Sequence, residues 1–164
     1  MKWALITLGF LLLVGIPVCT RPARAEYVRA VPAPTRAFGM LDAFNYERNI
    51  RGIHPLILDD ELSNISQEKS LNMIEFDYFS HVDLDGRTWA NRLNDYNRGF
   101  WSGGQVLGKA AGTDEQSEKA IVAAFMQSPT HAAIILNPNL NYVGVGAAID
   151  PMDGVTFFTM IMTN

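Results

Sequence analysis

The chain has 164 residues, 48% of them hydrophobic and 18% charged, which is the composition of one globular domain rather than a disordered segment. Thirteen basic and 17 acidic residues give a net charge of −4. This acidic balance argues against a nucleic-acid partner, which favours a basic face. The single cysteine, Cys19, excludes an internal disulfide bond and a cysteine-based zinc cluster. Three histidines remain as side chains that titrate near neutral pH.

Residues 1–25 have the features of a secretory signal peptide. Lys2 precedes an apolar run of 16 residues over 3–18, which is short for a spanning helix of about 20 residues. The small-x-small pattern Ala23-Arg24-Ala25 predicts cleavage after Ala25, and therefore a secreted or periplasmic protein with no membrane span after cleavage. The alternative is a retained N-terminal anchor. Cleavage would remove Cys19 and three basic residues, so the remaining 139 residues would carry 10 basic and 17 acidic residues, a net charge of −7.

The mature chain begins with a proline-containing stretch and continues into helical patterns. Residues 26–37 hold Pro32 and Pro34 with little apolar periodicity and are interpreted as a linker, which leaves 38–164 as the domain. Apolar spacing predicts a first helix over 38–50. Asp59 or Asp60 can cap a second helix. The expected inward face of that helix comprises Leu62, Ile65, Lys69, Met73 and Phe76.

The second half of the chain combines short helices with β-rich runs. Thr88 can cap a third helix with Trp89, Leu93 and Tyr96 inward, and the glycine-rich stretch 97–104 is expected to be a loop before a short strand over 105–109. A capping box over 113–116 predicts a fourth helix, and Ser128-Pro129 predicts the start of a short fifth one. The runs 142–149 and 155–162 flank a turn sequence and predict a hairpin. Helices followed by an antiparallel hairpin indicate a layered α+β domain.

His81 and His131 are the histidines whose surroundings suggest chemistry, although 50 residues separate them. His54 precedes Pro55 in an extended segment and is expected to be solvated. Asp83 and Asp85 follow His81 and could supply a carboxylate, but turn chemistry before Gly86 favours a solvated turn. Ser80 and Ser128 lie near the histidines in sequence. Without a Gly-x-Ser-x-Gly elbow, Ser128 is more simply a helix N-cap.

Several motifs, in their order and spacing, resemble the CAP superfamily, the group of cysteine-rich secretory proteins, antigen 5 and pathogenesis-related 1, and in particular its short bacterial branch. They are Asn45-x-x-Arg48, Ser80-His81, Gly104-Gln105-Val106-Leu107, Ser128-Pro129-Thr130-His131 and Val143-Gly144-Val145-Gly146. The resemblance spans about residues 38–164. It implies a three-layer α-β-α sandwich with a central antiparallel sheet, and a central cleft where His81 and His131 converge around a cavity that can hold a divalent metal.

The chain departs from the family pattern at positions that matter for this cavity. Gln105 stands where the family has a glutamate, Ala132 replaces the arginine after the second histidine, and Ser128 lies near the position of a second acid. A zinc site usually has three or more protein ligands, commonly histidine or carboxylate. With His81 and His131 as metal ligands and a neutral Gln105 beside them, Zn²⁺ or another divalent metal is expected to bind only weakly.

Three functions are consistent with this pattern. The first is a secreted, non-enzymatic binding module whose cleft, formed by His81, His131, Gln105 and Ser128, takes a small apolar ligand, a lipid or an extracellular protein. The second is a metal-assisted hydrolase such as a peptidase, which needs a carboxylate beside both histidines. The third is a structural envelope protein with a vestigial cleft. Fold resemblance alone does not choose among them.

Overall fold

The computed structural model describes residues 30–111 and 115–164. The predicted signal peptide lies outside these described residues. So do residues 26–29 of the predicted linker and residues 113–114 of the predicted capping box. The helices are α1 (Pro34–Asn49), α2 (Asp60–Glu75), α3 (Trp89–Asp95), α4 (Glu115–Gln127) and α5 (Pro129–Ile135). The strands are β1 (Val31–Pro32), β2 (Ile57–Leu58), β3 (Gly103–Ala110), β4 (Tyr142–Ile149) and β5 (Thr156–Thr163).

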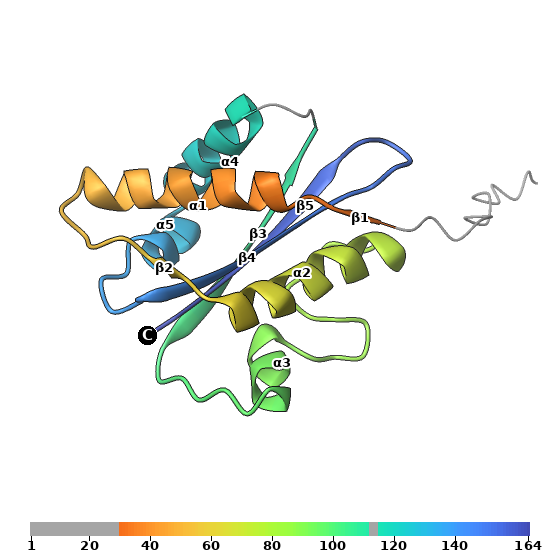
Figure 1. Ribbon diagram of the computed structural model, residues 1–164, viewed down its shortest axis with the longest axis horizontal. Coiled ribbons are helices and arrows are strands. Elements are labelled where there is room, and N and C mark those ends of the chain that lie inside the picture. Colours follow the sequence, from red (N-terminus) through yellow and green to blue (C-terminus); the bar gives the residue numbers. More distant parts are fainter. Residues whose placement is uncertain (1–29, 112–114) are drawn as a thin grey trace, which may run out of the picture.

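The sheet forms the middle layer of three (Figure 1). Its strand order is β1-β4-β5-β3, with antiparallel pairing throughout this path, and β2 adds a short parallel pairing to β4. Helices α1, α4 and α5 cover one face, and α2 with α3 covers the other. The predicted α-β-α sandwich with a central antiparallel sheet is therefore confirmed.

The alternation of side chains along the strands explains why both faces are covered. Val143, Val145 and Ala147 of β4 enter the core beneath α1, α4 and α5, together with Phe44 and Phe125. On the other face, alternate residues of the same sheet meet α2 and α3 in two smaller apolar clusters. Because the long strands are covered on both sides, most of their residues are apolar or glycine, and Gln105 and the three threonines of β5 are buried polar exceptions.

Helix α2 lies unusually close to β4. A Cβ atom on Gly144 would lie 2.0 Å from the carbonyl carbon of Leu62, and one on Gly146 would lie 2.2 Å from that of Ser66. The Ser66 hydroxyl uses this proximity to donate a hydrogen bond of 3.1 Å to the Gly144 carbonyl. Glycine at these two positions thus sets the height of α2 above the sheet.

The predicted linker is different in the structure wherever it is described. Val31 and Pro32 pair with Ile149 and Ala148 of β4, and α1 already begins at Pro34. The prolines suggested an irregular segment, but Pro is tolerated both at a sheet edge and in the first turn of a helix. Ala33 and Ala37 are the buried residues of this segment. Because their side chains are small, they give little of the apolar periodicity from which a helix is predicted.

Of the two aspartates expected as caps of α2, Asp59 is the N-cap, and its carboxylate accepts a bond of 2.9 Å from the Leu62 amide. Two other expectations change at the ends of helices and strands. Phe76 directly follows α2 and is 54% exposed, and Tyr96 directly follows α3 and is 40% exposed, so neither faces inward as expected. Strand β3 begins at Gly103, inside the expected loop, because Trp89 and Ile134 occupy the space that side chains at Gly103 and Gly104 would need.

Arg48 is the largest fully buried side chain described, and it ties α1 to the segment after α5. Its guanidinium donates hydrogen bonds to the carbonyls of Ile135 at 2.8 Å and of Leu140 at 3.0 Å. Burial lowers its pKa from the ordinary value. By fixing the end of α5, this residue also helps to fix the helix that carries His131.

Candidate functional site

His81 and Gln105 make direct contact. His81 lies in the segment between α2 and α3, and its ring Nδ1 lies 2.9 Å from the Oε1 of Gln105 on β3. Because an amide oxygen only accepts hydrogen bonds, this contact requires the His81 tautomer that carries its proton on Nδ1. The ring of His81 is exposed, whereas Gln105 is only 4% exposed.

His131 comes from α5 in the opposite helical layer, and α5 packs on β3 next to Gln105, where Ile134 occupies the space that a side chain at Gly104 would need. Burial lowers the pKa of His131, and the charge of His81 lowers it further. The ring packs on Phe125, with 4.9 Å between ring centroids. We refer to His81, Gln105 and His131 as the histidine site; the neutral form of His131 is the favoured one there.

Ser128 and His54 are placed differently from this trio. Ser128 is the N-cap of α5, as predicted, but its side chain makes no capping hydrogen bond. It is half-buried, and its position three residues before His131 is what connects it with the site. His54 is exposed in the segment before β2, as expected, with its Nε2 3.3 Å from the Leu140 carbonyl.

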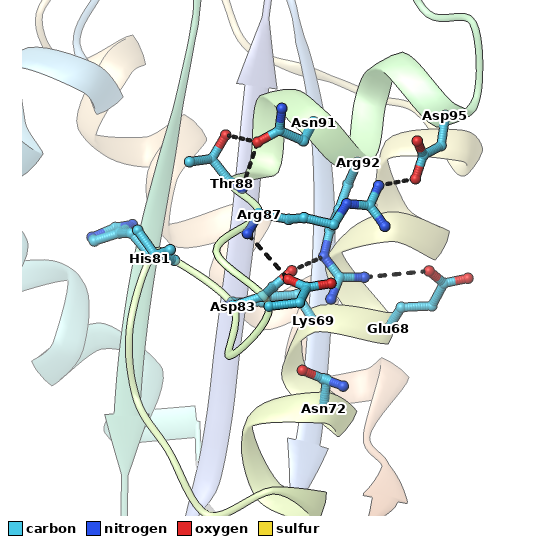
Figure 2. A network of polar contacts seen from close by, with 12 residues as sticks. Glu68, Lys69, Asn72, His81, Asp83, Arg87, Thr88, Asn91, Arg92 and Asp95 are labelled. Carbon is cyan, nitrogen blue, oxygen red and sulfur yellow. Dashed lines mark hydrogen bonds and ion pairs between the residues drawn. The ribbon is translucent and has the colours of Figure 1, made fainter.

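Asp83 does not lie in a solvated turn but at the centre of a buried polar network. Its Oδ1 lies 2.6 Å from the Lys69 Nζ and its Oδ2 lies 2.8 Å from the Arg92 Nε. The Tyr78 hydroxyl donates a third bond of 3.0 Å. Figure 2 shows Lys69 of α2 and Arg92 of α3 converging on Asp83, two residues beyond His81. The network therefore anchors the segment that carries His81 to both helices.

The charges in this network stabilise one another. Burial opposes ionisation of Asp83, but the hydrogen bonds from Arg92, Lys69 and Tyr78 outweigh it and hold the pKa of the carboxyl below its ordinary value. Burial lowers the pKa of Lys69 despite the hydrogen bond that its ammonium donates to Asp83, and burial together with Asp83 raises the pKa of Tyr78. We therefore take Asp83 as a carboxylate and Lys69 as a partly destabilised cation that depends on it.

Sequence reasoning missed this network, although one signal was present. Lys69 falls on the apolar face of α2 together with Ile65 and Met73, and it is 1% exposed. A lysine is almost never fully buried unless it is paired. Its position on that face therefore called for a buried acid, and Asp83 fills this role.

The residues of the histidine site do not make up a zinc site of the usual kind. Within residues 30–111 and 115–164, no three or more His, Cys, Asp or Glu side chains are grouped so that they could hold a metal ion. Asp83, the acid that could have compensated for Gln105, is already bound by Lys69 and Arg92. The two imidazoles would thus face a cation without a carboxylate, which is a poor donor set for Zn²⁺.

A separate cavity lies between α1 and α4 and includes neither histidine. Its volume is about 490 Å³, and it is lined by Gly39, Asp42, Ala43, Tyr46, Glu47, Lys119 and Val122. The mixture of apolar and charged side chains gives it no evident catalytic group. It is distinct from the histidine site, since α5 and β3 carry the latter.

The layered α+β fold with its central antiparallel sheet indicates the class to which the protein belongs. The model of the CAP family, described as the cysteine-rich secretory protein family, matches residues 41–162. This covers more than half of the chain, and the chain therefore belongs to the CAP family.

Known proteins agree with this assignment. YkwD of Bacillus subtilis, a protein described as uncharacterised, is 29% identical over 130 residues, which are 76% of this chain and 49% of YkwD. This chain thus spans about half the length of that curated relative. An outer surface protein from Borrelia burgdorferi has a TM-score of 0.70 at 19% identity, and the match covers 82% of this chain and 98% of that protein.

A second solved structure supports the same fold. An extracellular SCP-domain protein from Bacillus anthracis has a TM-score of 0.64 at 23% identity, over 76% of this chain and 39% of that protein. At these identities the likeness concerns the fold. Among the described residues, no helix has the length and apolar character needed to cross a membrane.

Proposed function

We propose that this chain is an exported CAP protein whose mature domain acts as a non-enzymatic binding module through the histidine site, with Ser128 beside it. The ligand would be a small apolar molecule, a lipid or an extracellular protein. The observation that carries the proposal is the contact of His81 with Gln105 on the edge strand β3, on which the helix that carries His131 also packs. Together the two histidines would provide a polar centre that can orient a ligand.

The chemistry of the site supports binding over hydrolysis. A metal-assisted hydrolase needs a carboxylate that can accept a proton beside the metal or the attacking water. Gln105 cannot accept a proton at neutral pH, and the Asp83 carboxylate is engaged by Lys69 and Arg92. We therefore assign no catalytic residue, and we expect any divalent metal at His81 and His131 to be weakly held.

Export is supported by the sequence of residues 1–25 and agrees with the extracellular and outer-surface relatives. A mature domain with a net charge of −7 would not favour nucleic acid as a partner. Aromatic and aliphatic side chains are exposed on either side of His81, with Phe79 and Val82 each 44% exposed. Exposed apolar side chains near His81 in the chain would suit the proposed ligands.

The proposal is tested by titrating the domain with lipid vesicles, small apolar compounds and divalent metals, using calorimetry and thermal shift. The decisive comparison is between the His81→Ala/His131→Ala double variant and His54→Ala, which removes an exposed histidine outside the site. We expect a response that the double variant abolishes and His54→Ala retains. No response to any class, or an equal response in both variants, would contradict a binding role for the site.

A further inference from the structure

The histidine site contains two buried polar atoms that have no hydrogen-bond partner. They are the Nε2 of Gln105 and the Nδ1 of His131. Buried polar groups in native proteins are nearly always hydrogen-bonded, and each exception calls for an explanation. Gln105 and the helix that carries His131 meet at β3, where Ile134 of α5 occupies the space beside Gly104. Each unpartnered atom is a position where a ligand group would gain a hydrogen bond on binding.

The orientation of the Gln105 amide decides which kind of atom the ligand must present. Its Oε1 is occupied by His81, at 2.9 Å from Nδ1, so the atom left without a partner is the NH₂ group. An NH₂ group only donates hydrogen bonds. A glutamate at position 105 would leave a second acceptor oxygen and a negative charge there instead. Residue 105 therefore sets whether the site attracts cations or hydrogen-bond acceptors.

The charges around the site favour a neutral ligand group. A cation would find two imidazoles and an amide but no carboxylate, because Asp83 is bound by Lys69 and Arg92. An anion would find no unpaired cation in that network, because both of those cations are bound to the same Asp83. Removing an ion from water without a counter-charge is costly, whereas a neutral group that completes a hydrogen bond is not penalised in this way.

We infer that the histidine site of this chain selects an uncharged amide group in place of a metal ion, and that Gln105 determines this selectivity. The inference rests on the proposed binding role of the site. The ligand carbonyl accepts a hydrogen bond from the Gln105 Nε2, and the ligand N–H donates to the Nδ1 of His131. The exposed ring of His81 is the member of the site that can shift to admit the group, and the exposed Val82 beside it offers an apolar contact to the rest of the ligand.

Three probes of matched shape separate the charge types: phenylacetamide, phenylacetate and phenethylammonium, with ZnCl₂ as a fourth titrant. Binding is followed by NMR of the Gln105 side-chain NH₂ and of the two histidine rings. We expect saturable shifts with phenylacetamide, and affinities at least about tenfold lower for the two charged probes, which lack a counter-charge in the site. The free protein should also show His81 with its proton on Nδ1.

The variant Gln105→Glu should reverse this preference. Its affinity for phenylacetamide should fall about tenfold, and its affinity for Zn²⁺ should rise roughly 10- to 100-fold, as for a restored metal-site carboxylate. Asn64→Asp, which adds the same charge at an exposed position of α2, should leave both affinities unchanged. If Gln105→Glu does not fold, Gln105→Met, which keeps the size and removes the donor, should still lose phenylacetamide binding.

The outcomes distinguish this inference from the proposal on which it depends. Zn²⁺ binding to the unmodified protein as tight as to Gln105→Glu, or amide binding unaffected by either variant, would overturn the selectivity. Failure of phenylacetamide to bind, while another ligand binds and needs both histidines, would overturn the selectivity but leave the binding role intact. If no probe and no ligand class binds at all, both are wrong.

Discussion

Asp83 lies two residues after His81, and its carboxylate is shared between Lys69 and Arg92 at 2.6 and 2.8 Å. The sequence Asp83-Leu84-Asp85-Gly86 reads as a turn, and Gly86 does have the positive φ of +85° that such a turn needs. The pattern was therefore correct about the backbone and wrong about the Asp83 side chain. Turn chemistry is local, whereas the burial of Asp83 depends on helices that lie elsewhere in the chain.

Replacing Asp83 should be among the most damaging single changes near the site. Asp83→Asn leaves the buried Lys69 ammonium without its counter-charge, and we expect the free energy of unfolding to fall by roughly 3–5 kcal/mol. Urea denaturation measures this loss. The paired change Lys69→Met/Asp83→Leu should recover part of it, because the fully buried ammonium is removed together with its counter-charge and Arg92 keeps Glu68 at 3.7 Å.

A neighbouring aspartate provides the control for this prediction. Asp85 is exposed and accepts a backbone hydrogen bond of 3.1 Å from Arg87. Asp85→Asn should change the free energy of unfolding by no more than about 0.5 kcal/mol. Equal losses in Asp83→Asn and Asp85→Asn would show that the network does not stabilise the fold.

The lowered pKa of His131 predicts a pH dependence of stability. Its folded-state pKa lies below the ordinary value of 6.5, so between those two values the unfolded chain binds more protons at this residue. The contribution of neutral His131 is therefore fully present above about pH 6.5 and is lost as the pH falls through the folded-state pKa. His131→Phe keeps a ring beside Phe125 but removes the titration.

We thus expect the unmodified protein to lose free energy of unfolding relative to His131→Phe as the pH is lowered from about 7.5 to about 5. Taking the difference between the two proteins cancels the titration of their shared carboxylates. Chemical denaturation at several pH values measures it. A difference that stays constant over this range would contradict a lowered pKa at His131.

At the scale of helices and strands, the sequence predicted most of what the structure contains. The helices with strong apolar periodicity and the hairpin around Gly154 are present, and Gly154 has the positive φ of +72° expected of its turn. The misjudged elements were those rich in small residues or proline, namely β1, the start of α1 and the first residues of β3. In these segments the neighbours across space, such as Trp89 over Gly103, decide the conformation.

The same dependence on neighbours makes Gly144 a sensitive position. Its missing Cβ would lie 2.0 Å from the Leu62 backbone, and a helix backbone cannot yield as a flexible side chain does. Gly144→Ala must therefore lift α2 from the sheet, and we expect a loss of about 3 kcal/mol or more in the free energy of unfolding. Thermal or urea denaturation provides the measurement.

Gly99→Ala is the matched control for this packing argument. Gly99 is exposed, and nothing lies within 4 Å of the position of its Cβ. Its substitution should stay within about 0.5 kcal/mol of the unmodified protein. Similar losses at Gly144 and Gly99 would mean that glycine acts through chain flexibility rather than through the close approach of α2.

At the scale of the whole molecule, the residues of the histidine site come from different layers of the α-β-α sandwich. His81 belongs to the layer of α2 and α3, His131 belongs to α5 in the other layer, and β3 at the sheet edge brings Gln105 to His81. The convergence of the two histidines stays a prediction of the family resemblance, since their spacing in sequence does not indicate it. The partnerless amide of Gln105 and the Asp83 network needed side-chain geometry, because neither leaves a periodic pattern.

The signal-peptide features of residues 1–25 predict how the whole chain is exported. Cleavage after Ala25 would remove three basic residues and Cys19, and it would shift the net charge from −4 to −7. When the full chain is expressed with an intact secretion pathway, the exported protein should begin at Glu26 by intact mass and N-terminal sequencing. It should be more acidic than the precursor in isoelectric focusing and should not react with thiol reagents, because it would contain no cysteine.

The variant Ala25→Phe is the control for cleavage. It places a bulky residue at the cleavage position, so the precursor should accumulate. A membrane-bound product that retains residues 1–25 and a reactive Cys19 would instead establish the N-terminal anchor as the correct interpretation.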